Sequence, residues 1–81
     1  MARYFFDLHD TRGYISDEEG RDFDDVADAR QHAVRCVRSI VADDVMFGFI
    51  DLTPRIEIRS ATDEQILTVR FAEAVLRVVV P

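Results

Sequence analysis

The sequence has little cysteine, no long apolar run and fewer basic than acidic residues, and each scarcity excludes a class of protein. The single cysteine, Cys36, cannot form an intramolecular disulfide and lacks a second cysteine for a structural zinc site, which fits a reducing compartment. The longest apolar runs, residues 45–50 and 78–80, are far shorter than the roughly 20 residues of a transmembrane helix. The N-terminus lacks the apolar stretch and cleavage site of a signal peptide. We therefore expect a cytoplasmic protein with no membrane association.

The shortage of positive charge excludes a further class. The ten basic residues are all arginines, against sixteen acidic residues, and the formal net charge is −6. Nonspecific affinity for nucleic acid comes from cations that displace counterions, so this balance argues against nucleic-acid binding and favours basic or apolar partners. The chain of 81 residues is expected to form one domain with one modest core and no separate catalytic lobe.

Two β-hairpins are predicted, one toward each end of the chain. Residues 3–10 alternate as a half-buried strand does, and residues 14–16 can pair back across a turn. Residues 55–59 and 65–71 form the second pair, joined by a turn at 60–64. The face of this sheet that points away from the core, termed the open face, is expected to carry solvated side chains: Phe5, Asp7, His9, Arg55, Glu57, Arg59, Ile66, Thr68 and Arg70.

Between the hairpins, residues 25–46 carry a helical pattern that Gly48 is expected to end. Its core-facing apolar stripe is predicted to consist of Val26, Ala29, Ala33, Cys36, Val37 and Ile40. The fold class is therefore α+β, of order β-β-α-β-β, with one long helix packed on one face of an antiparallel sheet. At the C-terminus, residues 72–76 can form one helical turn and residues 77–80 an edge strand or a tail.

Three further valines, Val34, Val41 and Val45, lie beside the predicted stripe and widen the apolar arc of the helix. Two explanations account for this valine shoulder. The C-terminal segment of the same chain can cover it, or it can form a dimer interface.

The densest chemical feature is a run of seven carboxylates within the twelve residues 17–28. Aspartates at the start of a helix accept hydrogen bonds from its free first-turn amides, so capping and solubility explain the run. A docking surface for a basic partner is the alternative, and its candidate residues are Asp17, Glu18, Glu19, Asp22 and Asp24. The spacing does not match a calcium-binding EF-hand loop, and we predict neither a metal nor a cofactor.

Candidate catalytic residues are few. His9 lies near Asp7 and Asp10, but Asp10 points to the other side of the predicted strand. Cys36 falls on the core stripe, where a buried and unreactive thiol is expected. No nucleophile elbow, phosphate-binding glycine loop or zinc spacing occurs in the chain. We therefore expect no enzymatic activity.

Several segments give the chain a family resemblance: RYFFDL (3–8), DEEG (17–20), DVADAR (25–30), RIEI (55–58) and LTVRF (67–71). With them the chain resembles a family of short proteins, found mostly in soil and plant-associated alphaproteobacteria, that carry a domain of unknown function. This resemblance implies no activity, cofactor or catalytic residue. A weaker resemblance is to HicB-type antitoxins, whose compact N-terminal domain also places a sheet before an acidic, alanine-rich helix.

Together these features predict a non-enzymatic interaction module. It is expected to self-associate, as a homodimer, through a strand edge or the valine shoulder. The alternative, implied by the HicB-type resemblance, is a binder that sequesters a small basic protein.

Overall fold

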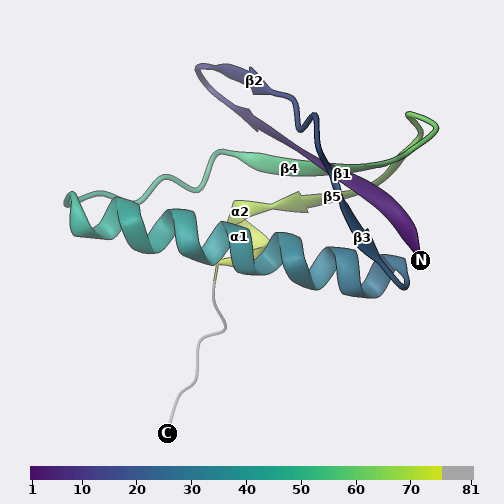
Figure 1. The fold of residues 1–81 in the computed structure, drawn as a ribbon. Coiled ribbons are helices and arrows are strands. Elements are labelled where there is room, and N and C mark those ends of the chain that lie inside the picture. The colour runs from purple at the N-terminus through teal and green to yellow at the C-terminus, as the bar shows by residue number, and fades with distance from the viewer. Residues whose placement is uncertain (76–81) are drawn as a thin grey trace, which may run out of the picture.

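The computed structural model describes residues 1–75, so the element predicted for residues 77–80 lies outside the described residues. The elements follow in the order β1 (Ala2–Asp10), β2 (Gly13–Ile15), β3 (Arg21–Phe23), α1 (Val26–Met46), β4 (Arg55–Ser60), β5 (Gln65–Arg70) and α2 (Phe71–Ala74). The strands form one antiparallel sheet, and α1 lies across one face of it (Figure 1). The predicted α+β class and both hairpins are confirmed.

Strand β1 is the centre of the sheet, whose order is β2-β1-β4-β5 with β3 also paired to β1. One edge of β1 pairs with β4. The other edge pairs with β2 near Leu8 and with β3 near Arg3. Strand β3 was not predicted, because three residues inside an acidic segment are too few to show the alternation of a strand. The acidic run is therefore partly strand, and not a loop throughout.

Helix α1 begins as the sequence predicts, because Asp25 is its N-cap and accepts a hydrogen bond from the Asp28 amide (2.9 Å). Its buried face is rotated relative to the predicted stripe and consists of Ala29, Ala33, Val34, Val37 and Val41. Val26 and Ile40, predicted to lie in the core, reach solvent instead. The rotation follows from the helix packing against α2 and β5 as well as β3 and β4.

The C-terminal end of α1 is closed by a Schellman motif. The Phe49 amide donates to the Asp44 carbonyl (3.2 Å), and the Gly48 amide donates to the Val45 carbonyl (3.0 Å). Gly48 has a φ of 90°, a left-handed conformation that favours glycine. Gly48 therefore ends the helix, as predicted, one residue beyond the cap at Phe47.

The short helix α2 folds back from β5 toward α1 and closes the core. The Phe71 amide donates to the Pro54 carbonyl (3.1 Å), and Arg38 of α1 donates from Nε to the Ala74 carbonyl (3.2 Å). The sheet and α2 contribute these buried residues: Tyr4, Ile56, Ile58, Val69, Phe71 and Ala74. Among the helices described, neither is both long and apolar enough to cross a bilayer.

Candidate functional site

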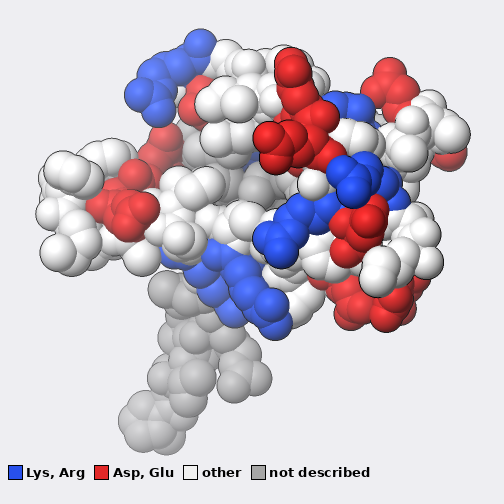
Figure 2. All heavy atoms as spheres, viewed as in Figure 1, with Lys and Arg blue, Asp and Glu red and all other residues white. Residues whose placement is uncertain are grey.

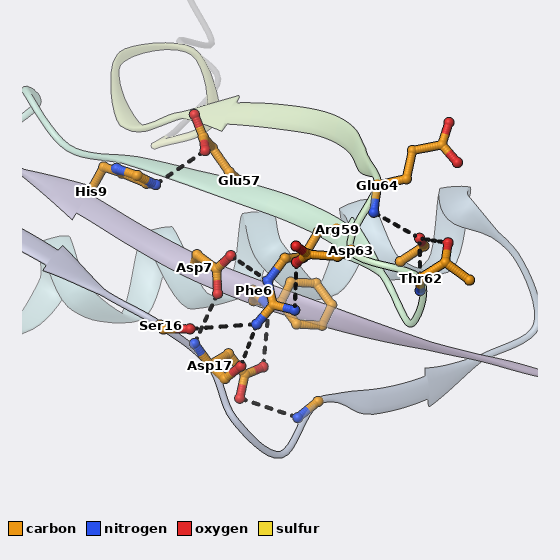
Figure 3. A network of polar contacts seen from close by, with 12 residues as sticks. Phe6, Asp7, His9, Ser16, Asp17, Glu57, Arg59, Thr62, Asp63 and Glu64 are labelled. Atoms are coloured by element: carbon orange, nitrogen blue, oxygen red, sulfur yellow. Dashed lines mark hydrogen bonds and ion pairs between the residues drawn. The ribbon is translucent and has the colours of Figure 1, made fainter.

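Asp17 fills the gap that β2 and β3 leave along the edge of β1. Its Oδ2 accepts a hydrogen bond from the Phe6 amide of β1 (3.1 Å) (Figure 3). Its Oδ1 accepts from the amides of Glu19 and Gly20, both at 3.2 Å. Burial alone would raise the pKa of Asp17, but these amides and the nearby guanidinium of Arg59 together hold the pKa below its ordinary value. Asp17 therefore anchors residues 16–20, termed the DEEG loop, to the sheet.

Asp7 lies beneath the DEEG loop and is only 3% exposed, so the prediction that it faces solvent is wrong. Its Oδ1 accepts a hydrogen bond from the Asp17 amide (2.9 Å), and its Oδ2 accepts from Arg59 Nε (2.7 Å). Figure 3 shows the Arg59 guanidinium reaching between Asp7 and the loop. The bond to Asp7 raises the pKa of Arg59 above its ordinary value.

Arg59 has two further roles in this network. Its Nη2 donates to the Asp17 carbonyl (2.8 Å), and its guanidinium carbon lies 4.6 Å from the centroid of the Phe5 ring, a cation–π distance. One side chain of β4 thus connects β1, the DEEG loop and an aromatic ring of the open face. Strand pairing alone would not hold the loop in this position.

A hollow of about 320 Å³ lies on the open face beside this network, and it is lined by Asp7, His9, Tyr14, Glu57, Arg59, Asp63 and Gln65. His9 Nε2 lies 3.1 Å from Glu57 Oε2, a distance suited to an ion pair when the imidazole is protonated, but without the alignment of a hydrogen bond. The His9 ring packs on Tyr14 at 4.5 Å between centroids. Arg55 Nε donates to the other oxygen of Glu57 (3.1 Å).

Each carboxylate that lines this hollow contacts at least one basic side chain. Asp7 and Asp63 both contact Arg59, and Glu57 lies between Arg55 and His9. Each of these carboxylates thus faces a basic side chain, which is the arrangement of a structural network. Within residues 1–75, His, Cys, Asp and Glu form no group of three or more that could hold a metal ion.

His32 and Cys36 of α1 form a second polar pair, which is partly buried against the sheet. The His32 ring lies 5.0 Å from that of Phe6 and 5.3 Å from that of Phe23, and its Nε2 is 3.5 Å from Cys36 Sγ. Burial, reinforced by the charges of Arg21 and Arg35, lowers the pKa of His32. Burial also raises the pKa of the Cys36 thiol, so that thiol stays protonated at neutral pH and is a poor nucleophile.

The position of His32 predicts a loss of stability in mild acid. Its folded-state pKa lies below the ordinary value of 6.5, so the unfolded chain binds more protons as the pH falls through that value. The stabilisation is complete above about pH 6.5 and is lost below it. Urea unfolding between about pH 7 and pH 5 is expected to give a smaller pH dependence for His32→Gln than for the wild type. His9→Gln is the control, and an equal reduction in both variants would contradict the assignment to His32.

The acids predicted to form a docking surface have different environments. Asp17 is engaged with backbone amides, and Asp22 Oδ1 lies 3.1 Å from Arg3 Nε. Arg3 also donates from Nη1 to the Glu19 carbonyl (2.7 Å). Asp22 stays exposed in spite of its ion pair, and the exposed side chains outside these contacts are Glu18, Glu19 and Asp24.

The predicted valine shoulder is also divided. Val34 and Val41 are buried within the chain, whereas Val45 is 52% exposed. Packing within the same chain therefore covers two of the three valines. Of these three valines, only Val45 is accessible to a partner.

Val45 belongs to a larger exposed surface that was not predicted. Met46 is 83% and Phe47 84% exposed, which is unusual for such apolar side chains. We term the whole set the apolar cluster: Val45, Met46, Phe47, Phe49, Ile50 and Leu52. Part of it borders a hollow of about 470 Å³. Figure 2 shows this end of α1, at the left, as mostly uncharged surface with a patch of acidic atoms. In the sequence, the only signal was the apolar run at residues 45–50.

These features define a small α+β domain with an internally paired polar network and one exposed apolar end. A family model for a domain of unknown function (DUF6894) matches residues 3–72, and the chain belongs to that family. No curated protein and no solved structure matches the chain. The resemblance to a family of unknown function is therefore confirmed.

Proposed function

We propose that the chain is a non-enzymatic interaction module and that it forms a homodimer through the apolar cluster. The observation that carries the proposal is the exposure of six large apolar side chains at one end of α1. Monomeric soluble proteins rarely leave a contiguous apolar patch of more than a few hundred Å² in water. A second copy that covers the cluster removes this surface from water.

The area of the cluster fits such a partner. With about 150–250 Å² for each large side chain, the exposed fractions correspond to on the order of 700 Å². Stable interfaces bury about 800 Å² on each partner. The cluster and its polar rim therefore supply the area that one side of a homodimer interface requires.

The non-enzymatic part of the proposal is supported by the polar network of Figure 3. Its charged side chains hold the DEEG loop and the sheet together, and the thiol of Cys36 is kept protonated by burial. A cytoplasmic setting is part of the proposal, because the single cysteine is free and partly buried.

Light scattering coupled to size-exclusion chromatography tests the dimer. The wild type, at tens of micromolar, is expected to have twice the chain mass of 9.3 kDa. The double variant Met46→Gln/Phe47→Asn is expected to raise the dimer dissociation constant at least about 100-fold. Each substitution replaces an apolar side chain by a polar one and removes about 1.5–3 kcal/mol of apolar burial. Both residues are exposed, so the variant should keep its circular dichroism spectrum and its unfolding midpoint.

The control is Ile66→Thr, which removes an exposed apolar side chain from β5, away from the cluster, and should leave the dimer intact. A wild type that stays monomeric would overturn the proposal. If that monomer co-purified from its native host with a small basic protein, the antitoxin-like alternative would be favoured, and the exposed Glu18, Glu19 and Asp24 would be its docking surface.

A further inference from the structure

The apolar cluster adjoins a helix end whose charges are unusual. Asp43 and Asp44 lie in the last turn of α1, and that turn contains no basic residue. The C-terminal end of a helix carries a partial negative charge and is normally complemented by cations. Here two carboxylates add to the negative end instead. Asp51 lies between Ile50 and Leu52 of the cluster, so acidic groups both precede the cluster and lie within its span in the sequence.

A two-fold dimer on the apolar cluster would bring two such acidic ends toward each other. The repulsion between them would oppose association unless a cation lay between them. Each copy must therefore offer the other a basic side chain close to its own apolar cluster. The charge at this helix end thus restricts which residues can complete the interface.

Arg12, in the turn between β1 and β2, is placed for this role. Its side chain is 90% exposed, and its contact with Asp10 is long, at 3.7 Å from Nη2 to Oδ2. Figure 1 shows this turn at the same end of the molecule as the C-terminus of α1. Hydrogen bonds from Thr53 are the main cause that lowers the pKa of Asp51, and the charge of Arg12 lowers it slightly further, in agreement with this placement of the turn.

We propose that Arg12 is a specificity-determining residue of the homodimer and that it contacts Asp43 and Asp44 of the second copy. The inference rests on the proposed function, because it requires self-association through the apolar cluster. In a two-fold interface the contact occurs twice. The cations missing from each helix end then come from the other copy, and copies of the chain recognise one another by charge as well as by apolar area.

Charge exchange tests this assignment. Arg12→Glu is expected to weaken self-association on the order of tenfold, because two rim contacts change from attraction to repulsion. Asp43→Arg/Asp44→Arg is expected to weaken it similarly. Mixed together, the two variants should form a heterodimer in excess of either homodimer, which native mass spectrometry can count. Arg30→Glu is the matched control, since it makes the same charge change at an exposed position near the other end of α1.

The outcomes separate this inference from the proposed function. A wild-type dimer that Arg12→Glu weakens no more than Arg30→Glu does would overturn the role of Arg12 and leave the dimer standing. Weakening by both interface variants without heterodimer formation on mixing would also overturn the pairing. A wild-type monomer would overturn both proposals. Preferential heterodimer formation, with the control unchanged, supports the assignment.

Discussion

Gly20→Ala is expected to lower the free energy of unfolding by about 3 kcal/mol, combining the cost of a left-handed alanine with that of an overpacked site. Gly20 has a φ of 70°. A Cβ at this position would lie 2.8 Å from the Tyr4 carbonyl oxygen and 2.9 Å from Cε1 of Phe5. The Tyr4 oxygen belongs to the backbone of β1, which is held between β3 and β4, so it cannot move away easily. The DEEG loop would have to lift from the sheet.

Urea unfolding followed by circular dichroism measures this effect, and the other two glycines provide matched controls. Gly13 and Gly48 also have positive φ, at 145° and 90°, but a Cβ on either meets nothing within 4 Å. Alanine at these positions should therefore carry conformational strain without a collision and cost about 1–2 kcal/mol. Equal losses at all three glycines would show that the close approach of the DEEG loop to β1 contributes nothing.

The DEEG loop also shows where prediction from the sequence ends. The sequence predicts the beginning of α1 because its signals are local: Asp25 precedes an apolar period of helical spacing and accepts the amide of a residue three positions later. The same run of acids contains Asp17, whose side chain accepts a hydrogen bond from the Phe6 amide, eleven positions earlier in the sequence. Nothing in the local pattern distinguishes an acid that caps a helix from one that bridges a strand edge.

The open face was predicted correctly in register, but the exposure of Asp7 was predicted wrongly. Alternation places Phe5, Asp7 and Arg59 on the same side of the sheet, as the pairing of β1 with β4 confirms. Alternation cannot reveal that another segment covers this side. Asp7 is buried because Arg59, 52 positions away, supplies the opposite charge and the DEEG loop excludes water.

The exposed end of α1 was missed for a different reason. The residues from Val45 to Leu52 are apolar enough to have been expected in a core, and periodicity describes which face of a helix is apolar without saying what covers it. The Schellman motif turns the chain at Gly48. The apolar side chains beyond it, Phe49 and Ile50, are left in water. Only coordinates separate a buried apolar run from an exposed one.

Replacing Arg59 by methionine is expected to cost about 3 kcal/mol of stability, because it leaves the buried carboxylate of Asp7 without a cation. Methionine retains much of the apolar contact with Phe5 and removes the hydrogen bonds to Asp7 and to the Asp17 carbonyl. The matched control is Arg3→Met, which breaks an exposed ion pair with Asp22 and should cost less than about 1 kcal/mol.

A double variant separates lost attraction from the cost of an unpaired charge. In Asp7→Asn/Arg59→Met a neutral amide replaces the carboxylate, yet the asparagine oxygen can still accept the hydrogen bond from the Asp17 amide. The double variant should therefore be more stable than Arg59→Met alone, by about 1–2 kcal/mol, in urea unfolding at neutral pH. If the double variant were the less stable of the two, the unpaired charge of Asp7 would not be the source of the loss. A more stable double variant would instead mean that the main role of Arg59 is to neutralise the buried carboxylate of Asp7. The ion pair that fixes the DEEG loop to the sheet is then maintained by the cost of burying an unpaired acid.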